Sequence, residues 1–183
     1  MIKGTLLAWG VLLMATPVLA QDCDNDREVS TPTARFSTDG AMVTDQETQL
    51  SWMRCAVGQT WSGTRCVGEA RVFDWQQAMA QVDRLNAQQF AGYDDWRMPL
   101  VPELASIVER HCFNPRMNTE VFTGAPAEIF WSAMEKMGMP DYAYTLDFGG
   151  GAARATAKDG AGAVRLVRGG PWWEPPAAMA GGR

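Results

Sequence analysis

Four cysteines constrain the fold of this 183-residue chain more than any other feature. An even number of cysteines in an exported protein predicts disulfides, because oxidising compartments favour them. Three pairings are possible. We favour Cys55–Cys66, which closes a short loop, and Cys23–Cys112, which ties an N-terminal arm to the body of the domain. Each disulfide should contribute about 3 kcal/mol by restricting the unfolded chain.

A metal site is the alternative for the same cysteines. Structural zinc sites use cysteines two to four residues apart, and no two cysteines of this chain have that spacing. We therefore expect no bound metal and no cofactor.

The first 20 residues are typical of a signal peptide. Lys3 supplies a positive start, and residues 6–19 are mostly apolar over a length too short for a comfortable membrane span. Small residues suit cleavage after Ala20, and the alternative is an uncleaved anchor. We expect a periplasmic or secreted protein with no transmembrane segment after cleavage.

The acidic charge of the chain argues against a general nucleic-acid binder. The net charge is −5, and loss of Lys3 with the signal peptide, −5 − 1, gives −6. Binding to phosphates needs a basic face. We expect a glycan or an envelope or extracellular protein as the partner, with a homo-oligomer as a further possibility.

The first half of the mature chain predicts an arm, a hairpin and a helix. Residues 21–34 form a polar arm, and residues 35–44 form a hairpin turned at Asp39-Gly40, a strong turn dipeptide. Apolar residues recur every three or four positions over residues 74–86, which predicts a helix. Asp74 suits its N-cap.

The rest of the chain predicts one more helix and several strands. A second helix is expected from Pro102 to about residue 110, because proline suits the first helical turn. Helices followed by short antiparallel strands indicate an α+β fold with two helices packed on a sheet. A Pro/Ala/Gly-rich tail is expected at 171–183, after strands at 50–53, 130–132, 143–148 and 164–167.

Several motifs resemble one known family in their order and spacing. They include residues 50–55 (Leu-Ser-Trp-Met-Arg-Cys), 58–61 (Gly-Gln-Thr-Trp), 92–99 (Gly-Tyr-Asp-Asp-Trp-Arg-Met-Pro) and 164–168 (Val-Arg-Leu-Val-Arg). Over residues 35–170 the chain resembles the C-terminal domain family of the bacterial collagen-like adhesin Lcl. The resemblance implies a C-type-lectin-like fold and an extracytoplasmic binding or adhesion module. The ligand of the adhesin that gives the family its name is a sulfated polysaccharide.

Seven residues within these patterned segments are interpreted as structural. Tryptophans inside regular elements favour core packing, and charged residues among them need partners. The structural set is Trp52, Asp95, Trp96, Arg97, Pro99, Glu103 and Trp131.

Another seven residues are candidates for binding. Aromatic side chains in loops can stack on sugars or fill partner pockets. Arg165 and Arg168 lie three apart on the expected last strand, so they should face opposite sides of it, one paired internally and one at the surface. With their basic neighbours they form a candidate anion site. The candidate set is Trp61, Arg154, Lys158, Arg165, Arg168, Trp172 and Trp173.

No set of residues indicates catalysis. The single histidine, His111, adjoins a cysteine expected to be disulfide-bonded, so a histidine-activated nucleophile is not expected. A hydrolase using a carboxylate pair remains an alternative. A structural accessory subunit of an envelope or pilus assembly is another. The carboxylates considered are Asp94, Asp95, Glu103 and Asp147.

Overall fold

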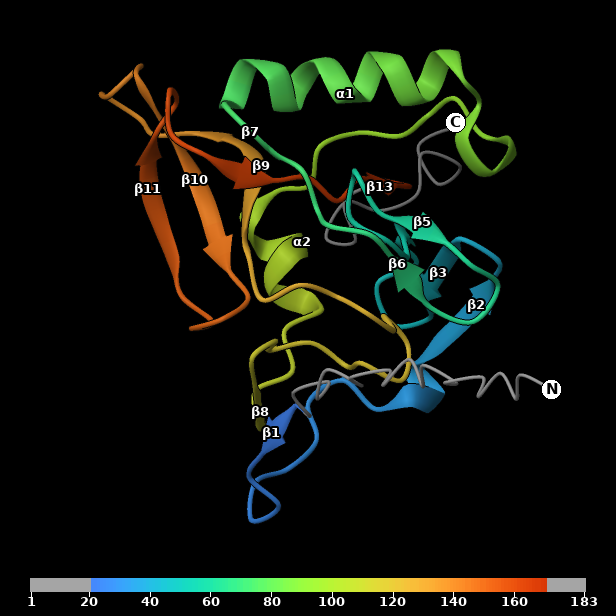
Figure 1. The fold of residues 1–183 in the computed structure, drawn as a ribbon. Helices are drawn as coiled ribbons and strands as arrows, with labels where there is room; N and C mark the ends of the chain where they lie inside the picture. The colour runs from blue at the N-terminus through green and yellow to red at the C-terminus, as the bar shows by residue number, and fades with distance from the viewer. Residues whose placement is uncertain (1–20, 171–183) are drawn as a thin grey trace, which may run out of the picture.

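A computed structural model describes residues 21–170, in which the chain forms two α-helices and two main β-sheets (Figure 1). The α+β class and its two helices are as predicted. The expected signal peptide and the tail with Trp172 and Trp173 lie outside the described residues.

The larger sheet has five strands in the order β11-β10-β9-β12-β7. Its pairings are antiparallel except one, because β12 runs parallel to β9 through Ala163 and Phe130. The expectation of purely antiparallel strands is therefore wrong at this one pair. The strands are β7 (Val72–Phe73), β9 (Ile129–Glu135), β10 (Tyr142–Asp147), β11 (Ala153–Ala157) and β12 (Gly162–Ala163).

The smaller sheet has four strands in the order β13-β4-β3-β2. Its β2–β3 hairpin pairs Asp39 with Met42 across a two-residue turn, and Gly40 takes the positive φ of 53° that this turn requires. The predicted hairpin is confirmed. The strands are β2 (Phe36–Asp39), β3 (Met42–Asp45), β4 (Ser51–Met53) and β13 (Val167–Arg168).

Two short ribbons, each with a disulfide, complete the strands. Cys55–Cys66 anchors the ribbon of β5 (Thr60–Trp61) and β6 (Cys66–Val67), and Cys23–Cys112 joins β1 (Asp22–Cys23) to β8 (Cys112–Phe113). The described cysteines are all paired in the favoured way. The β1–β8 ribbon lies at the opposite end of the molecule from α1 (Figure 1).

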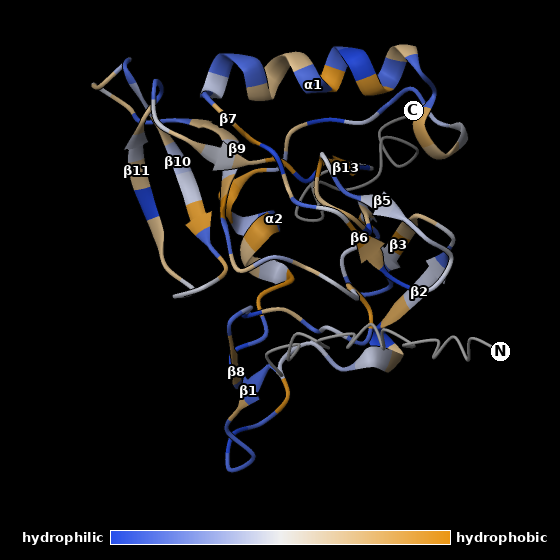
Figure 2. Ribbon diagram, in the orientation of Figure 1, coloured by the Kyte–Doolittle hydropathy of each residue, from blue (hydrophilic) through white to orange (hydrophobic). Residues whose placement is uncertain are grey.

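Helix α1 (Trp75–Ala87) lies across one end of the larger sheet (Figure 1). The Asp74 side chain accepts a hydrogen bond from the backbone N–H of Gln77, which caps the helix as predicted. Polar and apolar bands alternate along α1 in Figure 2, and its apolar stripe buries Ala78 and Leu85. The stripe therefore fixes which face of α1 packs on the sheet.

Helix α2 (Val101–Ser106) is shorter than predicted, because its last turn tightens. The N–H groups of Ile107 and Val108 donate three residues back, and the N–H of Glu109 donates to the Arg116 carbonyl. This last bond takes the chain away from the helix axis. Both apolar residues remain buried, so the apolar pattern continued beyond the helix that it predicted.

The strand expected at 164–167 is wrong over most of its length, because residues 164–166 lie in no strand and link the two sheets. Strand β12 ends at Ala163 and β13 begins at Val167. Between them the side chains still alternate, with Val164 and Leu166 in one apolar core and Ala163 and Val167 in the other. This link thus separates two cores as well as joining two sheets.

The tryptophans expected to be structural lie in these cores. Trp52 and Trp131 are fully buried and Trp96 nearly so. The Trp131 indole N–H donates to the Phe73 carbonyl at 2.8 Å, and that of Trp96 donates to Phe90 at the same distance. Both rings therefore fix neighbouring loops as well as filling space.

Arg97 and Glu103 form an ion pair at the start of α2. Both guanidinium NH2 groups contact the Glu103 carboxylate, at 2.6 and 2.8 Å, and Glu103 is 0% exposed. The carboxylate also accepts from the Leu100 N–H, and Arg97 donates to the Gly169 carbonyl. Pro99 lies between Arg97 and Glu103 in the sequence and is buried. Its carbonyl accepts a hydrogen bond from the N–H of Ala133. The interpretation of Arg97, Pro99 and Glu103 as structural therefore agrees with their contacts.

We predict that Arg97→Met destabilises the fold by about 3 kcal/mol, because it leaves a buried carboxylate unpaired. Arg27→Met is the matched control, since Arg27 pairs with Asp24 at the surface, and should cost less than about 1 kcal/mol. Urea unfolding followed by circular dichroism measures both. Equal losses in the two variants would contradict the assignment.

Candidate binding site

Two adjoining hollows of about 340 Å³ each lie between the Cys55–Cys66 loop and the C-terminal end of α1. Both are lined by Met53, Gln59 and Phe90, so they form one groove, here named the Trp61–Phe90 groove. Its other lining residues are Ala41, Cys55, Val57, Gly58, Thr60, Trp61, Arg71, Arg84 and Leu85.

Trp61 lies on β5 and is half-buried. The Arg54 guanidinium stacks over its ring at 3.9 Å from the centroid, and the Arg54 Nε donates to the Val121 carbonyl at 2.8 Å. Packing thus holds the indole in place, as the packing interpretation of Trp61 requires, while part of the indole lines the groove.

Phe90 is a groove residue that sequence reasoning missed. It begins the 3-10 helix η2 (Phe90–Gly92), and its neighbours Gln89 and Ala91 have positive φ angles of 47° and 53°. The Trp96 ring packs edge-on against Phe90 at 5.5 Å. A large apolar residue in a polar stretch just beyond a predicted helix was the signal that could have identified it.

Basic side chains border the groove at Arg71 and Arg84. Neither forms an ion pair with any residue in the described part of the chain, and both are exposed. Gly58 has φ +103° and a Cβ there would meet Arg71 at 2.6 Å, so only glycine allows the arginine to lie this close. The groove therefore combines two aromatic side chains, an amide and positive charge.

The candidate anion site does not form. Arg165 is 0% exposed, Arg168 lies on β13 of the smaller sheet, and Lys158 forms an ion pair with Glu135 at 2.7 Å. Arg154 is exposed on β11, on the larger sheet. Only Trp61 of the described binding candidates lines the groove.

Arg165 is a buried cation that forms no ion pair with any carboxylate in residues 21–170. Its Nη1 donates to the carbonyls of Met53 and Arg54, and its guanidinium lies near the rings of Phe122 and Phe130. Burial lowers the pKa of Arg165 to about 9, which leaves it charged at neutral pH. Arg165 is therefore the internal member of the arginine pair and is not available to a surface anion site.

Arg168 is the residue of this pair that reaches the surface. It donates to Asp95 at 2.7 and 3.1 Å and lies over the Tyr93 ring at 3.6 Å from the centroid. The hydrogen bonds from Arg168 hold the pKa of Asp95 below its ordinary value. Asp95 thus joins the 92–99 segment to β13, although it is exposed and was expected to be buried.

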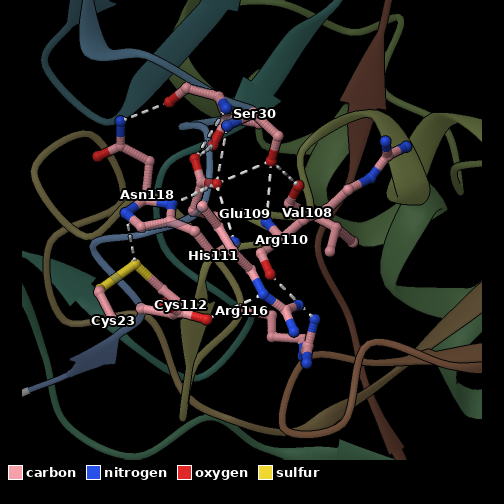
Figure 3. Close-up of polar contacts among 12 residues, drawn as sticks. Cys23, Ser30, Val108, Glu109, Arg110, His111, Cys112, Arg116 and Asn118 are labelled. Atoms are coloured by element: carbon pink, nitrogen blue, oxygen red, sulfur yellow. Dashed lines mark hydrogen bonds and ion pairs between the residues drawn. A yellow bond between two sulfur atoms is a disulfide. The ribbon is translucent and has the colours of Figure 1, made fainter.

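A cluster of polar side chains, separate from the groove, surrounds the Cys23–Cys112 disulfide. Figure 3 shows the His111 ring between Glu109 and the sulfurs, with Nδ1 at 2.6 Å from Glu109 Oε1 and Nε2 at 3.3 Å from Cys112 Sγ. The two sulfurs and the imidazole lie within 4.8 Å of one another. Because the sulfurs are bonded to each other, they are not the thiolates that a metal needs.

Three of the four carboxylates considered for catalysis have partners of their own. Asp95 is bound by Arg168 and Glu103 by Arg97, while Asp147 accepts from the N–H of Gly149. Asp94 is exposed on the 92–99 segment.

The sequence pattern of the Lcl C-terminal domain family matches residues 41–168. The chain belongs to this family. No curated protein matches the chain. Among the described residues, no helix is both long and apolar enough to cross a membrane.

The matched region of this Lcl C-terminal domain includes the whole Trp61–Phe90 groove and the Cys55–Cys66 disulfide. Cys23 lies outside the matched region, so the second disulfide joins the arm to the family domain.

Glu109 holds this arm against the domain. Burial alone would raise the pKa of Glu109, but hydrogen bonds from Thr31, His111 and Ser30 outweigh it and hold the pKa below its ordinary value of 4.5. A lowered folded-state pKa stabilises the fold above the ordinary value, and this contribution disappears as the pH falls.

We predict that Glu109→Gln costs about 2 kcal/mol at pH 7, because charged hydrogen bonds are lost. The difference in unfolding free energy between this variant and the native protein should shrink between pH 5 and pH 3, where the stabilising contribution of native Glu109 is lost. Urea unfolding across this pH range measures the difference. Glu120→Gln, a change at an exposed carboxyl, is the control and should show no such convergence. A constant difference at all pH values would contradict the prediction.

Proposed function

We propose that this chain is an exported, non-catalytic binding module that recognises a glycan through the Trp61–Phe90 groove. The observation that carries the proposal is the meeting of Trp61 and Phe90 in one open groove. Aromatic faces stack on the apolar faces of sugar rings, whereas the Gln59 amide is bound to the backbone of Ala56, Gly68 and Gly124. Arg71 and Arg84 favour a sugar that carries negative charge.

The location of the groove supports this proposal. It lies wholly within the region shared with a family named for an adhesin domain. A C-type-lectin-like arrangement of the two helices and two sheets belongs to the same proposal. Export is consistent with two disulfides, which oxidising compartments favour.

The environment of the ionisable groups favours binding over catalysis. A catalytic base must reach a substrate proton, yet His111 contacts Glu109 and a disulfide sulfur at its two nitrogens. The carboxylates of Asp95 and Glu103 are each occupied by an arginine.

We predict that the oxidised protein without its first 20 residues binds a sugar saturably on a glycan array. Trp61→Ala and Phe90→Ala should each weaken the affinity for that sugar about tenfold, since each removes a stacking surface worth about 1.4 kcal/mol. Isothermal titration calorimetry measures the change. Tyr142→Ala is the matched control, because Tyr142 is an exposed aromatic residue on β10, away from the groove.

Other outcomes separate the alternatives. Absence of any saturable sugar would contradict glycan recognition and favour a protein partner or an assembly subunit. Sugar binding that tolerates both groove variants would place the site elsewhere. Hydrolysis of a bound sugar would contradict the non-catalytic assignment. Thermal melting of each variant confirms that the fold is retained.

A further inference from the structure

The two disulfides of this protein differ in their chemical surroundings. His111 Nε2 lies 3.3 Å from Cys112 Sγ, whereas no hydrogen bond within residues 21–170 reaches the sulfurs of Cys55–Cys66. Imidazolium next to a sulfur stabilises the thiolate that forms when a disulfide opens. The Cys23–Cys112 bond therefore has an imidazole nitrogen at one of its two sulfurs.

Glu109 fixes the imidazole in this position. Its carboxylate accepts from His111 Nδ1 at 2.6 Å, and so the other ring nitrogen faces the sulfur (Figure 3). Ser30 and Thr31 each donate to the same carboxylate from backbone and side chain, at 2.6 to 2.9 Å. The carboxylate thus holds the ring with Nε2 toward Cys112, where the protonated ring would donate to the sulfur.

An incoming thiol has access to the bond. A hollow of about 400 Å³ is lined by Cys23, His111 and Cys112 together with Glu109. Cys23 is partly exposed, whereas Cys112 is only 4% exposed. The accessible sulfur thus belongs to Cys23, and the sulfur beside the imidazole is the one that would leave.

We propose that Cys23–Cys112 is a thiol–disulfide exchange site for a small thiol or an exposed protein dithiol. The incoming thiolate attacks Cys23 Sγ and forms a mixed disulfide with it. The Cys23–Cys112 bond breaks, Cys112 leaves with the electron pair, and His111 Nε2 supplies its proton. A second thiolate then releases Cys23 from the mixed disulfide, so that two thiols are oxidised to one disulfide while the cystine is reduced.

The arm has other attachments, which allow the bond to open in the folded protein. Gln21 donates to the carbonyls of Pro115 and Met117 at 2.5 and 2.7 Å, and Ser30 and Thr31 remain bound to Glu109. Reduction of this disulfide therefore leaves the arm held at both of its ends. Exchange can proceed in the native state without prior unfolding.

The test follows both disulfides in the same molecule. Tag-free oxidised protein is incubated with reduced glutathione between pH 5.5 and 8.5, free thiols are alkylated at intervals, and mass spectrometry reports each cystine separately. We expect Cys23–Cys112 to open at least tenfold faster than Cys55–Cys66, with a rate proportional to glutathione. Normalised to glutathione thiolate, the rate for Cys23–Cys112 should fall with rising pH as the imidazolium loses its proton.

Variants assign this effect to the imidazole. His111→Gln should slow opening of Cys23–Cys112 about tenfold and remove the pH dependence, with Cys55–Cys66 unchanged as the internal control. His111 is the sole histidine of the chain, so no other imidazole contributes. The other acidic groups near the site are Glu109, Glu120 in the hollow and Asp24, whose N–H donates to the His111 carbonyl. Glu120→Gln should keep the native pH profile.

Three results would overturn the proposal. They are equal opening rates of the two disulfides in the native protein, a native rate for Cys23–Cys112 in His111→Gln, and a rate independent of glutathione, which indicates opening only after unfolding. The first and third need no variant, so they decide the matter even if His111→Gln fails to fold.

Discussion

The link between β12 and β13 is the constraint on which the architecture depends. Within five residues the chain leaves the larger sheet, crosses the interior and enters the smaller sheet. Two of its carbonyls are paired on the way, with the Val164 carbonyl accepting from the N–H of Val57 and the Leu166 carbonyl from the N–H of Met53. The side chains of the link alternate between the two cores. A shift of the chain by one residue would therefore move each of these side chains into the other core.

Arg165 occupies one position of this alternation and shows how the link is fixed. Its side chain enters the core that contains Phe122 and Phe130, and its charge is met by two carbonyls of the β4 region. Burial of such a group is costly, so the register that provides those carbonyls is strongly favoured over its neighbours. A polar residue thereby specifies how two largely apolar cores meet.

Local patterns in the sequence predicted what depends on near neighbours. The hairpin at Asp39-Gly40, the Asp74 cap and the apolar stripe of α1 each need only contacts a few residues apart, and each is present. The pairing of the cysteines followed from loop length. Strand β11 was missed because its sequence, Ala-Arg-Ala-Thr-Ala, has no large apolar residue and no β-branched residue except Thr156.

Contacts between distant segments could not be predicted in the same way. Asp95 was assigned a structural role, but its pairing with Arg168, 73 residues away, depends on where β13 lies in the sheet. Phe90 enters the groove because two residues beside it take left-handed conformations, which no local pattern indicated. The groove was therefore recognised from the sequence at Trp61 alone.

The Cys23–Cys112 bond has a mechanical consequence. Strand β1 has two residues, and a ribbon this short resists little when its end is pulled. With the cystine intact, tension applied at the N-terminal side passes through a covalent bond directly into β8 and the segment that follows it. A domain tethered from this side would bear load through sulfur while this bond is intact, and through the hydrogen bonds of Gln21, Ser30 and Thr31 once it is reduced.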